Sequence, residues 1–161
     1  MHQFQRKKEE PYTFCRWIGE TYNTLTNLPF IIIGIYRLYL SDDELQCPTL
    51  VLLYQLAVLA GICSAIHHCC AHIPNNHWSI YVDWLPIASS ILVLQYNYGF
   101  LQLIHLLSFT SIVLVCIAFA LLVSDHIFTP LPVPIGHCLW HISAAIAIDL
   151  VYQDLHSCAC W

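Results

Sequence analysis

The sequence predicts an all-α fold, a polytopic bundle of about five transmembrane helices. Of its 161 residues, 58% are hydrophobic and only 9% are charged, and the mean hydropathy is +0.65. These values lie outside the range of ordinary soluble domains. No internal repeat, low-complexity segment or long linker divides the chain, so we expect one membrane domain over residues 1–161. Within it, residues 1–22 form a polar N-terminal segment and residues 154–161 a short tail.

The expected spans follow from the length of the apolar runs, because a helix needs about 20 mostly apolar residues to cross a bilayer. They are residues 24–40, 48–68, 81–96, a stretch within 101–123, and 133–152. Residues 97–124 also have room for two shorter helices, which makes six segments the alternative count. The first run is long enough to span and follows a polar segment, so we expect no cleavable signal peptide.

Basic residues predict the orientation of the bundle. They lie at the beginning of the chain and are Arg6, Lys7, Lys8, Arg16 and Arg37. Because four of them precede the first span, the positive-inside rule places the N-terminus in the cytosol, with Arg37 as the exception.

Polar side chains within apolar spans are costly and therefore mark functional positions. Ser64 and His68 are four residues apart, on one face of the second span. Asp83 stands just before Pro86, which predicts a place near the start of the third helix. His137 and His141 share a face at the start of the last span. With five spans, all these residues lie at the same membrane surface, whereas six spans would separate the last histidine pair from the others.

Three imidazoles with one open position are typical of a catalytic zinc site, where the metal lowers the pKa of a bound water toward about 7. Asp83 would orient that water and accept its proton, and Ser64 would donate a hydrogen bond to the developing oxyanion. This set fits hydrolysis of an amide or ester in a lipid. His67 and His72 are the rivals of His68 as a ligand, although Pro74 predicts that the helix ends near His72.

Three motifs resemble the signatures of the alkaline ceramidases, namely "GICSAIHH", "DWLP" and "HCLWH". The upstream segment "GETYNTLTN" is similar to the N-terminal segment of that family, which belongs to a superfamily of membrane hydrolases with the adiponectin-receptor-like proteins. The resemblance implies zinc on His68, His137 and His141, with Ser64 and Asp83 beside the bound water. It also implies hydrolysis of the N-acyl bond of ceramide, a lipid in the bilayer, to sphingosine and a fatty acid. No nucleic-acid partner is expected, and in a eukaryote the expected location is the endoplasmic reticulum or Golgi membrane.

Two departures from the family pattern modify these expectations. Family members usually have seven spans, but only 53 residues separate Asp83 from His137, which leaves room for about two fewer helices. The family also carries an acidic N-terminal calcium site, whose opening residues are replaced here by three basic ones. Glu9 and Glu20 match its acidic positions, but two carboxylates are too few for a cation that prefers several oxygen ligands. We therefore expect no tight calcium binding, and Glu20 also fits a helix N-terminus as a first-turn carboxylate.

Other functions remain open at this stage. The two HxxxH pairs, His68 with His72 and His137 with His141, would also suit two irons or a haem in a membrane oxidoreductase. A further alternative is a receptor-like scaffold that holds a metal without turnover.

Overall fold

The computed structural model describes residues 20–40, 47–73, 77–127 and 135–159, and these residues form helices with no strand. The helices are α1 (Thr21–Leu25), α2 (Leu28–Leu40), α3 (Pro48–Cys69), the short 3-10 helix η2 (Cys70–His72), α4 (Trp78–Tyr98), α5 (Phe100–Leu106), α6 (Phe109–Ile127) and α7 (Ile135–Ala159). The predicted all-α bundle is confirmed.

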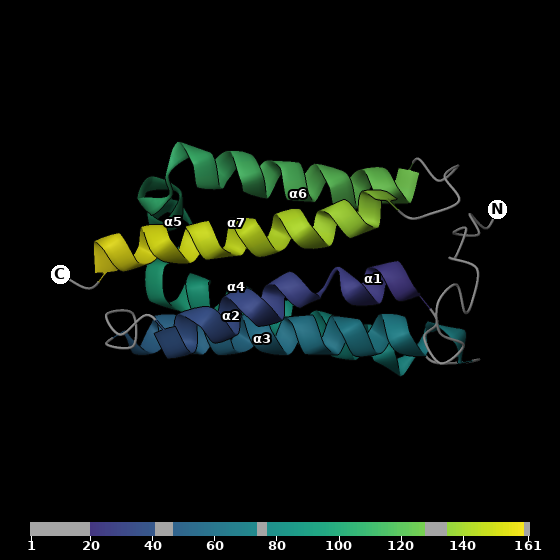
Figure 1. The fold of residues 1–161 in the computed structure, drawn as a ribbon. Helices are drawn as coiled ribbons and strands as arrows, with labels where there is room; N and C mark the ends of the chain where they lie inside the picture. The colour runs from purple at the N-terminus through teal and green to yellow at the C-terminus, as the bar shows by residue number, and fades with distance from the viewer. Residues whose placement is uncertain (1–19, 41–46, 74–76, 128–134, 160–161) are drawn as a thin grey trace.

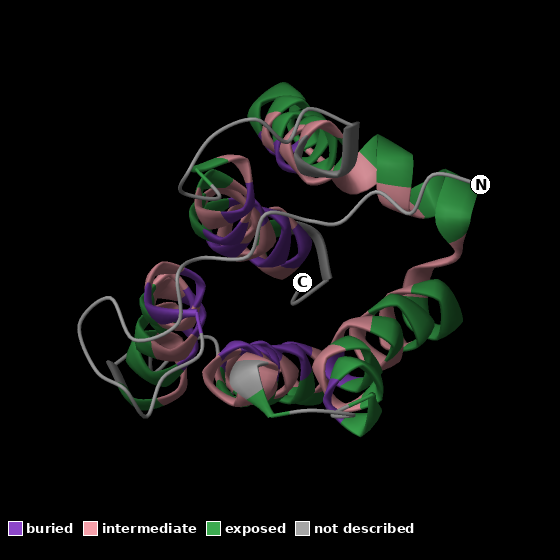
Figure 2. Ribbon diagram, turned by 90° about the vertical axis from the view of Figure 1, so that its right-hand side faces the viewer, coloured by how far each residue is buried: buried purple, intermediate pink, exposed green. Residues whose placement is uncertain are grey.

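The long helices lie side by side along one direction (Figure 1). Helix α3 packs between α2 and α4, α2 also contacts α7, and α7 packs against α6. The order across the bundle is therefore α6, α7, α2, α3 and α4. In the end-on view, the buried residues gather on the sides of the helices that face one another, whereas the outer sides are exposed (Figure 2). An apolar outer surface is expected of a protein whose surroundings are lipid.

The core joins the beginning of α3 to the end of α7. Its buried side chains are Leu50, Leu53, Tyr54 and Ala57 on α3 and Val151, Tyr152 and Leu155 on α7. The rings of Tyr54 and Tyr152 meet edge to face with their centroids 5.1 Å apart, an arrangement that aromatic quadrupoles favour. Because these two ends pack together, the other end of α3 lies beside the beginning of α7.

Two glycines allow α2 and α3 to approach closely. A Cβ added to Gly61 would lie 2.8 Å from Cγ1 of Ile31 and 2.9 Å from Cβ of Phe30. On α2, a Cβ added to Gly34 would meet the side chain of Val58 at 2.5 Å. Small residues at such contacts are a common way to pack membrane helices, where lipid provides no hydrophobic driving force between them. The close contact holds α1 and α2 beside the half of α3 that carries His68.

Two of the described helices, residues 48–69 and 135–157, are long and apolar enough to cross a membrane. The pair α4 and α5 passes the same test together, but it bends by 89° at Gly99, whose φ is +69°. The apolar part of α6, residues 109–124, is shorter, and the first run is divided into α1 and α2. The expected count of five spans is therefore approximate. The seven residues of α5 extend only about 10 Å, too short for the additional span of the six-segment alternative.

The start of α4 differs from the prediction. The helix begins at Trp78, so Asp83 lies in its second turn and Pro86 inside it rather than in the first turn. A proline is tolerated within a membrane helix because neighbouring groups and small local adjustments satisfy the freed carbonyl. Asp83 is thus near the start of the helix, as predicted, but the first-turn place expected of Pro86 is wrong.

An ion pair joins α2 to α7. The guanidinium of Arg37 donates to both carboxylate oxygens of Asp149, from Nε to Oδ1 at 2.8 Å and from Nη2 to Oδ2 at 3.0 Å. Nε2 of Gln153 donates to the same carboxylate at 2.8 Å. Arg37 is therefore held within the bundle, and it should not be counted as a loop charge in the positive-inside rule. The cytosolic N-terminus itself stays a prediction.

Candidate metal centre

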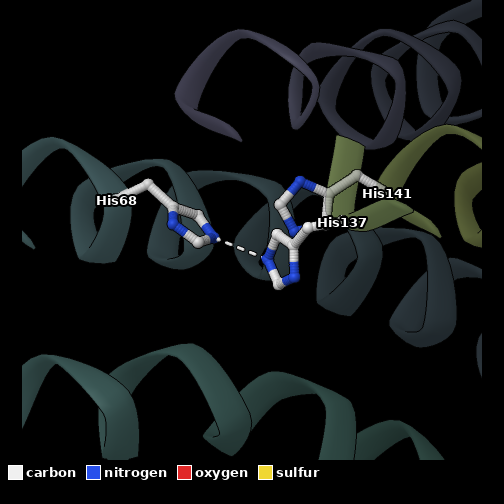
Figure 3. Close-up of side chains that lie close together, drawn as sticks. All are labelled: His68, His137 and His141. Atoms are coloured by element: carbon white, nitrogen blue, oxygen red, sulfur yellow. Dashed lines mark hydrogen bonds between the residues drawn. The ribbon is translucent and has the colours of Figure 1, made fainter. Parts of the chain in front are cut away.

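Three buried histidines converge where the end of α3 meets the beginning of α7 (Figure 3). Nε2 of His68 and Nε2 of His137 are 3.2 Å apart. One ring nitrogen from each of His68, His137 and His141 lies within 4.8 Å of the others. The rings are packed against one another, with centroids 4.6 Å apart for His137 and His141 and 5.2 Å for His68 and His141.

The local sequence explains this convergence. His137 and His141 are one helical turn apart in the first two turns of α7, so both rings leave the same face. His68 is the penultimate residue of α3, and the antiparallel packing of the two helices brings it opposite the pair. Their exposed fractions are 2% for His68, 6% for His137 and 0% for His141. Buried polar rings need hydrogen-bond partners, and the residues at the two ends of α1 provide two of them.

The two residues that flank α1, Glu20 at its N-cap and Thr26 at its C-cap, contact the histidines. Oε2 of Glu20 is 2.6 Å from Nδ1 of His68, and the backbone N–H of Glu20 donates to the carbonyl of His68 at 3.1 Å. Oγ1 of Thr26 is 3.1 Å from Nδ1 of His141. Asn23 links the two sides, since it donates from Nδ2 to Oε2 of Glu20 and accepts from Sγ of Cys138, both at 3.1 Å.

Ser64 and Asp83 are not members of the histidine cluster. Oγ of Ser64 is buried one turn before His68 and has no hydrogen-bond partner among the described residues. Asp83 comes from α4, and its Oδ1 is also buried without such a partner. Its carboxylate is close enough to Cys63 on α3 to interact with it electrostatically. Unsatisfied buried oxygens are uncommon in native proteins and are often found at functional sites.

The rival residues have other positions. Nδ1 of His67 is 2.8 Å from Oγ of Ser79 on α4, so this ring helps to join α3 to α4. The α-helix ends at Cys69, as Pro74 predicted, and His72 lies in the 3-10 helix that follows. His68 and His72 therefore do not form a continuous helical HxxxH pair, although the His72 side chain lies outside the described residues. Glu9 also lies outside them.

Sequence reasoning missed the contacts of Glu20 and Thr26. Glu20 precedes α1 at its N-cap position, but its side chain makes no capping hydrogen bond there and turns to His68 instead. Both residues lie within the segment "GETYNTLTN", in which Glu20 was interpreted as a calcium-position match or a first-turn carboxylate and Thr26 was given no role. The sequence offered only the presence of acidic and hydroxyl residues in this segment as a signal. The tertiary structure shows which of them contact the histidines.

Comparison with known proteins identifies the family. The model of the family described as Ceramidase matches residues 9–129, most of the chain. The chain belongs to the ceramidase family. No curated protein and no solved structure gave a significant match. The ceramidase match contains Glu20, Ser64, His68 and Asp83 but ends before His137 and His141, so the structure adds an independent observation by bringing that pair to His68. Together with the apolar helices, membership indicates a membrane-associated hydrolase with a lipid substrate at the level of the family.

One pair of the three histidines has the spacing of two ligands to a tetrahedral metal ion, and all three ring nitrogens lie within 4.8 Å of one another. Zinc–nitrogen bonds of about 2.0–2.1 Å in tetrahedral geometry place two ligand nitrogens about 3.3 Å apart. The corresponding separation between His68 and His137 is 3.2 Å. The carboxylate of Glu20 behind His68 is the kind of partner that metal-binding histidines usually have on their other ring nitrogen. The cluster could therefore hold a metal ion through three imidazoles, and no carboxylate of the described residues belongs to it.

Proposed function

We propose that this member of the ceramidase family is a zinc-dependent amidase that hydrolyses the N-acyl bond of ceramide. In the reaction, water adds its hydroxyl to the acyl carbon and a proton to the amide nitrogen. The carbon–nitrogen bond breaks, and a fatty acid and sphingosine leave. The observation that carries the proposal is the convergence of three buried histidines, with one nitrogen from each within 4.8 Å, in a chain of this family.

Each residue has a proposed role. His68, His137 and His141 hold zinc, which when bound supplies an acidified water and polarises the amide carbonyl. The Ser64 hydroxyl donates a hydrogen bond to the carbonyl oxygen as this oxygen gains negative charge. Asp83 accepts the proton of the attacking water and passes it to the leaving amine. The buried oxygens of Ser64 and Asp83 support these two roles because neither is hydrogen-bonded to another group of the described residues.

The part of the chain between Asp83 and His137 is shorter than in the seven-span pattern. The proposed metal ligands lie outside that part, on α3 and α7. Helix α1 contacts both of these helices. We expect the active enzyme to lie in an internal membrane, with ceramide reaching it from the bilayer.

Metal content and hydrolysis together test the proposal. Mass spectrometry of detergent-purified protein should find one zinc per chain in the wild type and none in His68→Ala. His67→Ala is the matched control, because this neighbouring ring contacts Ser79 and should leave the zinc in place. Release of labelled fatty acid from N-acyl-labelled ceramide should follow the zinc content. Iron in place of zinc would favour an oxidoreductase, and zinc without hydrolysis would favour a non-catalytic scaffold.

A further inference from the structure

The hydrogen bonds around α1 determine which nitrogen of two histidines carries the proton. An ionised carboxylate only accepts hydrogen bonds. Oε2 of Glu20 already accepts from Nδ2 of Asn23, and it lies 2.6 Å from Nδ1 of His68. With Glu20 ionised, Nδ1 of His68 is the donor and carries the ring proton. In the neutral ring, Nε2 is left with the lone pair, and this is the nitrogen that faces His137.

The hydroxyl of Thr26 has the same effect on His141. A hydroxyl has one proton, and Oγ1 of Thr26 directs it to the backbone carbonyls of Tyr22 at 2.9 Å and Asn23 at 3.1 Å. The hydroxyl oxygen is then an acceptor toward Nδ1 of His141, which lies 3.1 Å away. His141 therefore also has its proton on Nδ1 and its lone pair on Nε2. The residues at the two ends of α1 thus favour the same tautomer in a histidine of α3 and in a histidine of α7.

We propose that Glu20 and Thr26 are positioning residues that hold His68 and His141 in the Nδ1–H tautomer, with both Nε2 lone pairs available to a common ligand. The consequence for zinc affinity rests on the proposed function, but the tautomers themselves do not. The acidic residue that matched a calcium position thereby acts on an imidazole, through a direct contact at 2.6 Å. Loss of such a partner typically weakens metal binding about 10- to 100-fold.

The tautomers are measured first, in metal-free protein labelled with 15N-histidine in detergent micelles. Long-range proton–nitrogen spectra distinguish Nδ1–H from Nε2–H rings, and single histidine substitutions assign the signals. We expect His68 and His141 as Nδ1–H tautomers in the wild type. Glu20→Ala should release His68, and Thr26→Val should release His141, into mixtures of both forms. A wild-type Nε2–H signal assigned to His68 or to His141 would overturn the proposal.

Zinc affinity is measured next, by competition with a chelator and by the visible spectrum of the cobalt-substituted protein. Glu20→Ala and Thr26→Val should weaken zinc binding about 10- to 100-fold and alter the cobalt spectrum. Thr24→Val is the matched control, since the Thr24 hydroxyl donates to the backbone carbonyl of Glu20 at 2.7 Å and its loss should leave zinc affinity unchanged. Thr26→Ser and Glu20→Gln retain an acceptor oxygen and should restore the tautomers even if the larger changes unfold the protein.

The outcomes separate the two proposals. If the wild type holds both Nδ1–H tautomers but binds neither zinc nor cobalt, the positioning role stands and the proposed zinc enzyme is wrong. If the wild type binds zinc and neither Glu20→Ala nor Thr26→Val changes the tautomers or the affinity, the positioning role is wrong and the zinc site stands.

Discussion

The ion pair between Arg37 and Asp149 should contribute to stability mainly through the cost of leaving one charge alone. Both side chains are only 18% exposed, and the contact is bidentate. Breaking a fully buried pair by removing one partner costs about 3–5 kcal/mol, whereas an exposed pair contributes about 0–1 kcal/mol. We expect Asp149→Leu to lower the free energy of unfolding by about 2–3 kcal/mol, because the remaining guanidinium lies inside an apolar bundle.

Thermal unfolding in detergent, followed by tryptophan fluorescence, measures the effect. For a chain of this size, 1 kcal/mol corresponds to about 2–4 °C, so Asp149→Leu should lower Tm by roughly 4–12 °C. The double variant Arg37→Leu with Asp149→Leu should recover most of this loss, because it removes both charges. Gln153→Leu is the control for the neutral hydrogen bond, which contributes about 1 kcal/mol. The single variant Arg37→Leu completes the comparison. A loss in the double variant equal to the sum of the losses in Arg37→Leu and Asp149→Leu would refute the reasoning.

Three further predictions concern the site and its support. His137→Ala should express normally but lose both zinc and hydrolysis, and zinc retained at one per chain would remove His137 from the ligand set. Asp83→Asn should keep its zinc while kcat for ceramide falls about 10²- to 10⁴-fold; an unchanged kcat would exclude the general-base role. Gly61→Ala should lower the free energy of unfolding by about 1–3 kcal/mol, because the new Cβ lies 2.8 Å from Ile31; unaltered unfolding in a denaturant titration would show that α2 gives way without cost.

The sequence predicted the helices and the meeting of the three histidines better than it predicted the breaks in the helices. The apolar runs 48–68 and 133–152 correspond to α3 and α7. An odd number of spans predicted that His68 lies near the pair on α7, and the three histidines do lie together. A break between the runs 81–96 and 101–123 was expected, but the bend of 89° at Gly99 was not, because hydropathy does not register a positive φ. The division between α1 and α2 was not predicted either, since residues 24–40 read as one run.

The surroundings of the histidines were beyond the reach of sequence patterns. Glu20 is separated from His68 by 48 residues and Thr26 from His141 by 115 residues, so no helical spacing connects them. Resemblance to the ceramidases drew attention to the segment that holds both residues, but it pointed Glu20 toward calcium. Only packing of α1 against α3 and α7 decides which side chains meet.

The order of the helices along the chain has a consequence for biosynthesis. His68 and His137 are 69 residues apart, and α7 follows every other helix that the structure describes. A nascent chain that has inserted α1 to α6 contains only one of the three imidazoles, and one imidazole has no chelating power. Under the proposed function, metal binding by all three histidines therefore follows docking of α7, and a chain that stops before α7 cannot form the site.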